Sequence, residues 1–187
     1  MDVIKFKFKI LVLGAVGVGR TAFEVYVRNL NPHNSDDLLN AESKSRRFMT
    51  GASLSGLNMD IGAYKVNLLF WSISDHESMR FLHPSFIKSA VGAILLYDIT
   101  NASSIARLPY WLDLLSEQYD GLPMVLAGNK LDLAESRAIS REEGLSFQLE
   151  HNLTSFTEIS MKTGVGVYEM FEYLRDLLSR LLPNNQR

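Results

Sequence analysis

A glycine-rich segment near the N-terminus has the composition of a phosphate-binding loop. It reads Gly14-Ala15-Val16-Gly17-Val18-Gly19-Arg20-Thr21 and fits the pattern G-x-x-x-x-G-K-[ST] everywhere except at the lysine, where Arg20 brings a larger, planar guanidinium. An apolar run precedes the segment and a helical pattern follows it, so backbone N–H groups can point at phosphate oxygens beside a helix N-terminus. Thr21 is placed to offer its hydroxyl to Mg²⁺. Taken alone, the segment also fits a tight strand-to-helix turn without a ligand.

Two further polar segments each follow an apolar run. Asn129-Lys130-Leu131-Asp132 comes after the run 124–127, and Ser160-Met161-Lys162-Thr163 comes after a weaker strand pattern. Either segment alone fits a polar turn. In this order, and together with the glycine-rich loop, they resemble the motifs of Ras-superfamily small GTPases. The whole chain is most similar to the Rab and Ras branches, and Val91–Thr100 closely resembles the central strand of that family.

The resemblance implies a guanine site. Asp132 would accept hydrogen bonds from the ring N–H and the amino group of the base, and a carboxylate left without donors is costly, so adenine is rejected. Asn129 would brace the pocket, the stem of Lys130 would cover the ring, and a backbone N–H of the S-M-K segment would meet the guanine carbonyl oxygen. The predicted nucleotide-binding residues are Gly14, Val16, Gly17, Val18, Gly19, Arg20, Thr21, Ala22, Asn129, Lys130, Asp132, Ser160, Met161 and Lys162.

The segment Trp71–Glu77 aligns without gaps to the family pattern W-D-T-A-G-Q-E but differs at three functional positions. Ser72 replaces the aspartate that supports Mg²⁺ through a water. Asp75 replaces the glycine whose N–H meets the γ-phosphate, and His76 replaces the glutamine that orients the attacking water, which makes it the candidate catalytic residue. Val16 adds a branched side chain where the family has a small or polar one. These changes predict slow intrinsic hydrolysis.

The resemblance also implies GTP or GDP as the cofactor, bound together with Mg²⁺. Thr21 is one predicted metal ligand. Thr50 is the best candidate for the threonine that caps Mg²⁺ in the GTP state, although Gly51-Ala52-Ser53 follows the family pattern only loosely. Because Ser72 removes one negative charge from the outer shell of the metal, we expect weaker Mg²⁺ binding.

Alternating strand and helix patterns must position these motifs. Strands are expected at 5–13, 52–61, 64–71, 91–97, 124–127 and 156–159. Helices are expected at 21–30, 78–89, 103–119, 140–151 and 167–182, and Ser140 with Glu143 makes a capping box. Gly62 marks a hairpin turn. The pattern predicts an α/β fold with a six-stranded, mostly parallel, doubly wound sheet and helices on both faces, in one G domain (1–182) with a short tail (183–187).

Composition narrows the functional class. The chain has 187 residues, a formal net charge of −2 and no cysteine, so overall charge favours neither nucleic acid nor an anionic membrane. Without cysteine, disulfides, prenylation and palmitoylation are excluded for this sequence, and no apolar run is long enough to span a bilayer. We therefore expect a cytoplasmic protein, monomeric, without a lipid anchor or direct membrane insertion.

Three functional hypotheses remain open. The first is a Rab-like switch or binding module that holds GDP or GTP, turns over slowly and contacts an unidentified effector or regulatory protein. The second is a non-hydrolysing pseudo-GTPase scaffold whose nucleotide is structural or absent, motivated by Arg20 and Ser72. The third is a GTPase whose partner supplies the missing groups in trans. Helical spacing makes Phe81, Phe86 and Trp111 more typical of core residues than of a partner surface.

Overall fold

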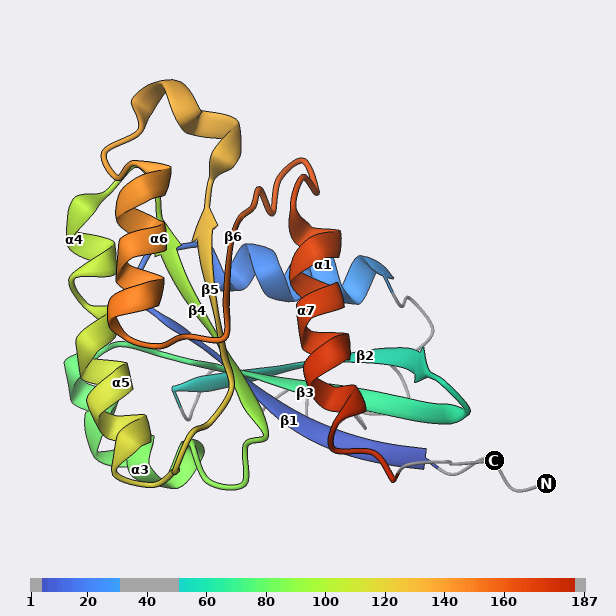
Figure 1. The fold of residues 1–187 in the computed structure, drawn as a ribbon. Helices are drawn as coiled ribbons and strands as arrows, with labels where there is room; N and C mark the ends of the chain where they lie inside the picture. Colours follow the sequence, from blue (N-terminus) through green and yellow to red (C-terminus); the bar gives the residue numbers. More distant parts are fainter. Residues whose placement is uncertain (1–4, 31–50, 184–187) are drawn as a thin grey trace.

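The computed structural model describes residues 5–30 and 51–183, which form a sheet with helices on both faces (Figure 1). The sheet in these residues has six strands, in the order β2-β3-β1-β4-β5-β6. Only the β2–β3 pair is antiparallel; the other neighbours are parallel. The strands are β1 (Lys5–Gly14), β2 (Ala52–Ile61), β3 (Tyr64–Ile73), β4 (Gly92–Asp98), β5 (Met124–Asn129) and β6 (Ser155–Glu158). The predicted fold class is confirmed.

The strand order brings the sequence motifs to one edge of the sheet. β1 lies between β3 and β4, with Val12 opposite Ser72 on one side and Gly14 opposite Leu96 on the other. Successive connections therefore leave β1 in opposite directions, which opens a crevice at the carboxyl ends of the strands, the usual ligand position in open α/β sheets. The loops after β1, β3 and β5 all begin at this edge.

Two apolar cores fix the helices to the sheet. Alternation along β1 sends Ile10 and Val12 into one core and Leu11 and Leu13 into the other. The first core lies under α1 (Arg20–Leu30) and α7 (Val167–Ser179), and the second lies under α3 (His83–Phe86), α5 (Leu108–Ser116) and α6 (Arg141–Glu150) (Figure 1). The remaining helical segments are η1 (Glu77–Leu82), α4 (Ala102–Ile105) and η2 (Leu131–Ser136).

Two of the expected helices are broken, and a proline accounts for each break. The segment expected as one helix at 78–89 forms the 3-10 helix η1 and the single turn α3, which has Pro84 in its first turn. The segment expected at 103–119 forms α4 and α5, with Pro109 in the first turn of α5. Proline has no N–H to donate to the preceding turn, so a new helix starts there instead of the old one continuing.

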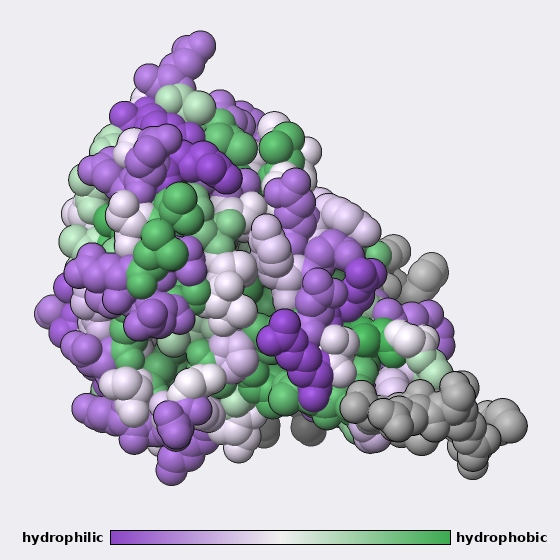
Figure 2. All heavy atoms as spheres, in the orientation of Figure 1, coloured by the Kyte–Doolittle hydropathy of each residue, from purple (hydrophilic) through white to green (hydrophobic). Residues whose placement is uncertain are grey.

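Other local predictions are confirmed. Ser140 and Glu143 form the reciprocal capping box at the start of α6, and Gly62 turns the β2–β3 hairpin with a φ of 60°. Trp111 is fully buried, but Phe81 is 75% exposed, so the expectation of a core position is wrong for Phe81. On the face shown in Figure 2, apolar side chains are interspersed with hydrophilic ones. Among the described residues, no helix has the length and apolar character needed to cross a membrane.

Candidate functional site

The glycine-rich loop connects β1 to α1 and passes against Asn129 at the end of β5. Gly19 has a φ of 104°, and a Cβ at this position would lie 2.2 Å from Nδ2 of Asn129. Only glycine allows this backbone to approach so closely. Helix α1 begins directly after it at Arg20, so the loop and the first helical N–H groups lie together at the crevice.

Asn129 links two loops that are distant in sequence. Its Nδ2 donates to the carbonyl oxygen of Val18 at 2.8 Å, and its Oδ1 accepts from the backbone N–H of Met161 at 3.1 Å. The side chain is buried, with the residue 2% exposed. Both ends of the amide are therefore used, and the glycine-rich loop and the S-M-K segment are held at a fixed separation.

Asp132 receives partners from the same S-M-K segment. Ser160 donates its hydroxyl to Oδ1 of Asp132 at 2.6 Å, and the ammonium of Lys162 lies 3.7 Å from Oδ2. The hydrogen bond from Ser160 is the main reason that the pKa of Asp132 lies below its usual value. The carboxylate is thus ionised at neutral pH and oriented as an acceptor.

Lys130 has a left-handed backbone and is fixed by a partner that the sequence reasoning missed. Its φ is 71°, and its ammonium lies 2.6 Å from Oδ2 of Asp98 at the end of β4. Burial raises the pKa of Asp98, but hydrogen bonds from Lys130 and Thr100 outweigh this effect and lower the pKa below its usual value. The sequence signal was available, because Asp98 ends the apolar strand that resembles the central strand of the family.

Two pockets lie along α1. The larger, of about 840 Å³, includes Val16, Gly19, Arg20, Thr21, Ser72 and His76 in its lining. The second is lined by Thr21, Ala22, Val25, Tyr26, Asn29, Leu30, Met161 and Lys162. Because Thr21 and Val25 line both, the two pockets are adjacent. The second includes Met161 and Lys162 of the S-M-K segment, whereas Asn129, Lys130 and Asp132 line neither of the two.

The structure places the three changed positions of the Trp71–Glu77 segment differently. Ser72 is 5% exposed, and its Oγ has no hydrogen-bond partner within the described part of the chain. Asp75 is buried and does not line the larger pocket; its carboxylate lies 3.3 Å from Nη2 of Arg107, just before α5. His76 is exposed at the pocket wall. Thr50 lies outside the described residues.

A buried histidine that the sequence reasoning missed also holds this segment. His83 is fully buried; its Nε2 lies 2.8 Å from the carbonyl oxygen of Ser74, and its Nδ1 lies 2.8 Å from the hydroxyl of Tyr110. Burial is the main cause that lowers the pKa of His83, so the ring is neutral at pH 7. Since a carbonyl only accepts, Nε2 carries the proton and Nδ1 accepts from Tyr110. No motif marks this residue; its position before Pro84 is the only signal.

The positive charge of Arg20 has two carboxylates nearby. Burial lowers the pKa of its guanidinium, while the nearby carboxylates of Asp75 and Glu24 act in the opposite direction. Glu24 is a further residue that the sequence reasoning missed. It lines the larger pocket from the second turn of α1 and is only 8% exposed.

Comparisons with known proteins agree with this geometry. Residues 9–180 match the model of the Ras family. The chain is 32% identical to GTP-binding protein ypt3 of Schizosaccharomyces pombe over 184 residues, which cover 98% of this chain and 81% of that protein. It is 32% identical to Ras-related protein Rab-18 of Caenorhabditis elegans (89% and 77% covered) and 28% identical to Ras-related protein Rab-12 of Mus musculus (95% and 70% covered). The chain therefore belongs to the Ras family and is a Rab-like small GTPase.

Proposed function

We propose that this chain binds a guanine nucleotide together with Mg²⁺, acts as a regulatory switch or binding module, and hydrolyses GTP slowly. The observation that carries the proposal is the hydrogen-bonded frame around the predicted base site. Ser160 orients Asp132, and Asn129 joins the loops of Val18 and Met161. Small-GTPase activity in general follows from the family; its reduced rate is specific to this chain.

The base side is equipped for guanine. The Asp132 carboxylate is ionised and already oriented by Ser160, so guanine, which presents two adjacent N–H donors, satisfies it. Adenine would place an acceptor against this carboxylate and supply none of the N–H donors that guanine offers, so we expect guanine to be preferred. Ala22, Met161 and Lys162 line the adjacent pocket.

The phosphate side fits a nucleotide and Mg²⁺. The glycine-rich loop and the first turn of α1 present backbone N–H groups, and Arg20 adds a positive charge. Thr21 would hold Mg²⁺ through its hydroxyl, and the unpartnered Oγ of Ser72 is a polar group at the same pocket that a bound shell of oxygen ligands would satisfy. When bound, Mg²⁺ neutralises charge that develops on the phosphates.

The hydrolytic side supports a low rate. His76 stands at the position of the family glutamine, but its side chain is exposed on the pocket wall. We therefore do not assign it the role of a general base for the attacking water. Asp75, at the position of the family glycine, forms an ion pair with Arg107. Val16 is 65% exposed and lines the pocket, so its branched side chain would crowd an attacking water or an arginine supplied by a partner. That crowding disfavours hydrolysis completed in trans.

Two measurements test the proposal. Nucleotide released from freshly purified protein and identified by chromatography should be guanine nucleotide near one equivalent, with a large GTP fraction. Single-turnover hydrolysis should be slower than that of a conventional Ras-like domain. A protein that emerges empty and takes up neither GDP nor GTP with Mg²⁺ would refute nucleotide binding, whereas an ordinary hydrolysis rate would refute only the slow turnover.

A pseudo-GTPase scaffold is the second candidate, and a specific observation favours it. The contacts from Asp75 to Arg107 and from Ser74 to His83 hold the segment after β3 through groups of the chain itself. A scaffold would show the same thermal midpoint with and without Mg²⁺ and GDP, whereas a protein that binds the nucleotide in its folded state is stabilised by it. An effector or regulatory partner, a cytoplasmic location and a monomeric state remain predictions.

A further inference from the structure

Glu24 carries a buried carboxylate on the wall of the larger pocket beside α1. It lies in the second turn of α1, and its Oε1 accepts a hydrogen bond from the hydroxyl of Ser53 on β2. Its Oε2 lies 3.4 Å from Nη2 of Arg28 on the next turn of the helix. Glutamate is almost never buried without such partners. The two contacts hold the carboxylate in one place.

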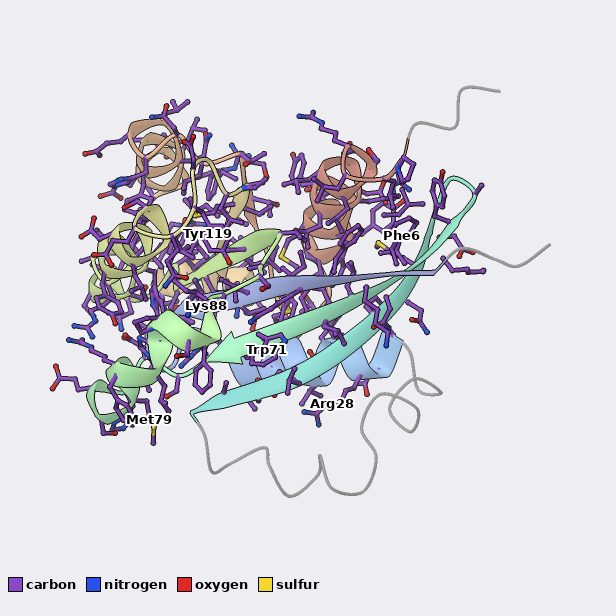
Figure 3. The ribbon with its side chains drawn as sticks, turned by 90° about the horizontal axis from the view of Figure 1, so that it is seen from below. Phe6, Arg28, Trp71, Met79, Lys88 and Tyr119 are labelled. Carbon is purple, nitrogen blue, oxygen red and sulfur yellow. The ribbon has the colours of Figure 1, made fainter. Side chains whose placement is uncertain are left out.

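That place is close to Thr21, a predicted ligand of Mg²⁺, and to Ser72, which stands where the family has the supporting aspartate. Ser53 and Ser72 are directly opposite each other in the antiparallel β2–β3 pair, so their Cβ atoms are about 4.5–5.5 Å apart. On α1, Thr21 and Glu24 are three residues apart and share a face of the helix. Figure 3 shows α1 alongside the β2–β3 hairpin, with Arg28 at the side of β2. All four residues, Thr21, Glu24, Ser53 and Ser72, line the larger pocket.

Ser72 supplies the second, independent observation. Its buried Oγ lines this pocket without a hydrogen-bond partner in the part of the chain that the structure describes. Buried hydroxyls normally have a hydrogen-bond partner, so a polar ligand in the pocket is expected to bind next to this Oγ. A water bound to a cation would form that hydrogen bond with Oγ of Ser72. Ser72 itself cannot supply the negative charge that the family pattern has at this position.

We propose that Glu24 supplies the carboxylate that Ser72 lacks and supports the Mg²⁺ of the nucleotide from α1 instead of from β3. The inference rests on the proposed nucleotide-binding function. The described residues contain no group of three or more His, Cys, Asp or Glu side chains able to hold a metal ion by themselves. Mg²⁺ does not need one, because it keeps several waters and is usually held by one or two carboxylates together with substrate phosphates.

The competing explanation is that Glu24 only anchors Ser53 and Arg28. The two explanations predict effects of different kind. If Glu24 supports the metal, replacing it with glutamine weakens nucleotide binding only when Mg²⁺ is present. Without Mg²⁺, removing a negative charge beside the phosphates leaves binding unchanged or makes it tighter. A purely structural role would weaken binding equally in both conditions.

The experiment measures the dissociation constant of fluorescent GDP with saturating Mg²⁺ and with excess EDTA. For Glu24→Gln we expect the gain in affinity from Mg²⁺ to fall by about 10- to 100-fold, the usual loss when an outer-shell partner of a metal is removed. The double variant Glu24→Gln with Ser72→Asp should recover that gain. Glu172→Gln is the matched control, because Glu172 pairs with Arg175 on α7, away from the pocket, at 2.5 Å.

Each outcome decides a separate point. An unchanged Mg²⁺ gain in Glu24→Gln, or an equal loss of affinity in both buffers, would overturn the assignment of Glu24 and leave the proposed function intact. Wild-type protein that binds no GDP in either buffer would overturn the function and this inference with it. If Glu24→Gln does not fold, Ser53→Ala keeps the carboxylate but removes its anchor, and a smaller loss of the Mg²⁺ gain is expected; no loss would contradict the inference.

Discussion

The ion pair between Asp75 and Arg107 should contribute to stability in a strongly asymmetric way. Two nitrogens of Arg107, Nε and Nη2, both lie 3.3 Å from Oδ2 of Asp75. The side chain of Asp75 is 4% exposed, whereas that of Arg107 is 43% exposed. Losing Arg107 therefore takes the hydrogen-bonded partner from a buried carboxylate and leaves it only the nearby charge of Arg20, while neutralising Asp75 leaves Arg107 with a guanidinium that water can still solvate.

The expected magnitudes follow from these exposures. Breaking a fully buried pair costs about 3–5 kcal/mol and breaking an exposed pair costs about 0–1 kcal/mol. Because Arg107 is partly exposed, we expect Arg107→Met to lower the free energy of unfolding by about 2–3 kcal/mol, between those limits. Asp75→Asn keeps the shape of the side chain and a hydrogen-bond acceptor, so we expect a loss of about 0.5–1 kcal/mol.

Urea unfolding of the two single variants and the double variant provides the assay. In the Asp75→Asn background the side chain at position 75 carries no charge that needs Arg107, so Arg107→Met should cost much less, giving a coupling energy of about 1–2 kcal/mol. The exposed pair Lys65–Asp60, with side chains 57% and 62% exposed, is the control, and Lys65→Met should cost under about 0.5 kcal/mol. Equal costs for the two single variants, or no coupling, would refute the reasoning.

Three further predictions concern the frame of the site. Asn129→Ala removes the two hydrogen bonds that join the loops, and each bond contributes about 1 kcal/mol. The affinity for GDP, measured by fluorescence, should therefore fall by about 10-fold or more. An unchanged affinity would argue against the bracing role of Asn129. Gly19→Ala would place a Cβ 2.2 Å from Nδ2 of Asn129, at a backbone φ of 104°. It should therefore lower the stability of the folded protein more than Gly62→Ala, whose Cβ meets nothing within 4 Å. Equal urea midpoints for the two variants would contradict this prediction. Because burial lowers the folded-state pKa of His83, the unfolded chain binds the proton more readily, and stability that is complete above about pH 6.5 is lost as the pH falls towards the folded pKa. His83→Phe should lack this component in a comparison of urea midpoints across that range, and a parallel pH profile would count against the assignment.

The strands could be predicted because their signals are local. A fully apolar run such as 124–127 suits a strand buried on both faces, and β5 indeed begins at Met124. The hairpin was also readable, because β2 spans the predicted Ala52–Ile61 and Gly62 provides the turn. The broken helices were readable in principle, since Pro84 and Pro109 both stand inside the expected helical segments.

The charge contacts could not be predicted because they join distant segments. Asp75 and Arg107 are 32 positions apart, and their contact depends on how α5 packs against the sheet. His83 presents the same difficulty, since its partners Ser74 and Tyr110 come from two different elements. Glu24 left a weak signal: it stands beside Phe23 and before Val27, on the stripe of α1 that the fold buries. A charged residue in that position indicates a partner but does not identify it.

The residues that depart from the family pattern at functional positions lie on the phosphate side of the predicted site, not on the base side. On the predicted base side, Asp132 and Asn129 have hydrogen-bond partners within the chain, so the proposed affinity for guanine would depend on groups that are already in place. On the other side, the carboxylate added at Asp75 is neutralised by Arg107 outside the lining of the pocket, and it repels a γ-phosphate less than its sequence position suggests. We expect the response to the γ-phosphate to be reduced there, because a segment already held by Arg107 would gain less from contact with a γ-phosphate. GDP and GTP should therefore bind with similar affinity, and a large preference for either would show that the segment still responds to the γ-phosphate.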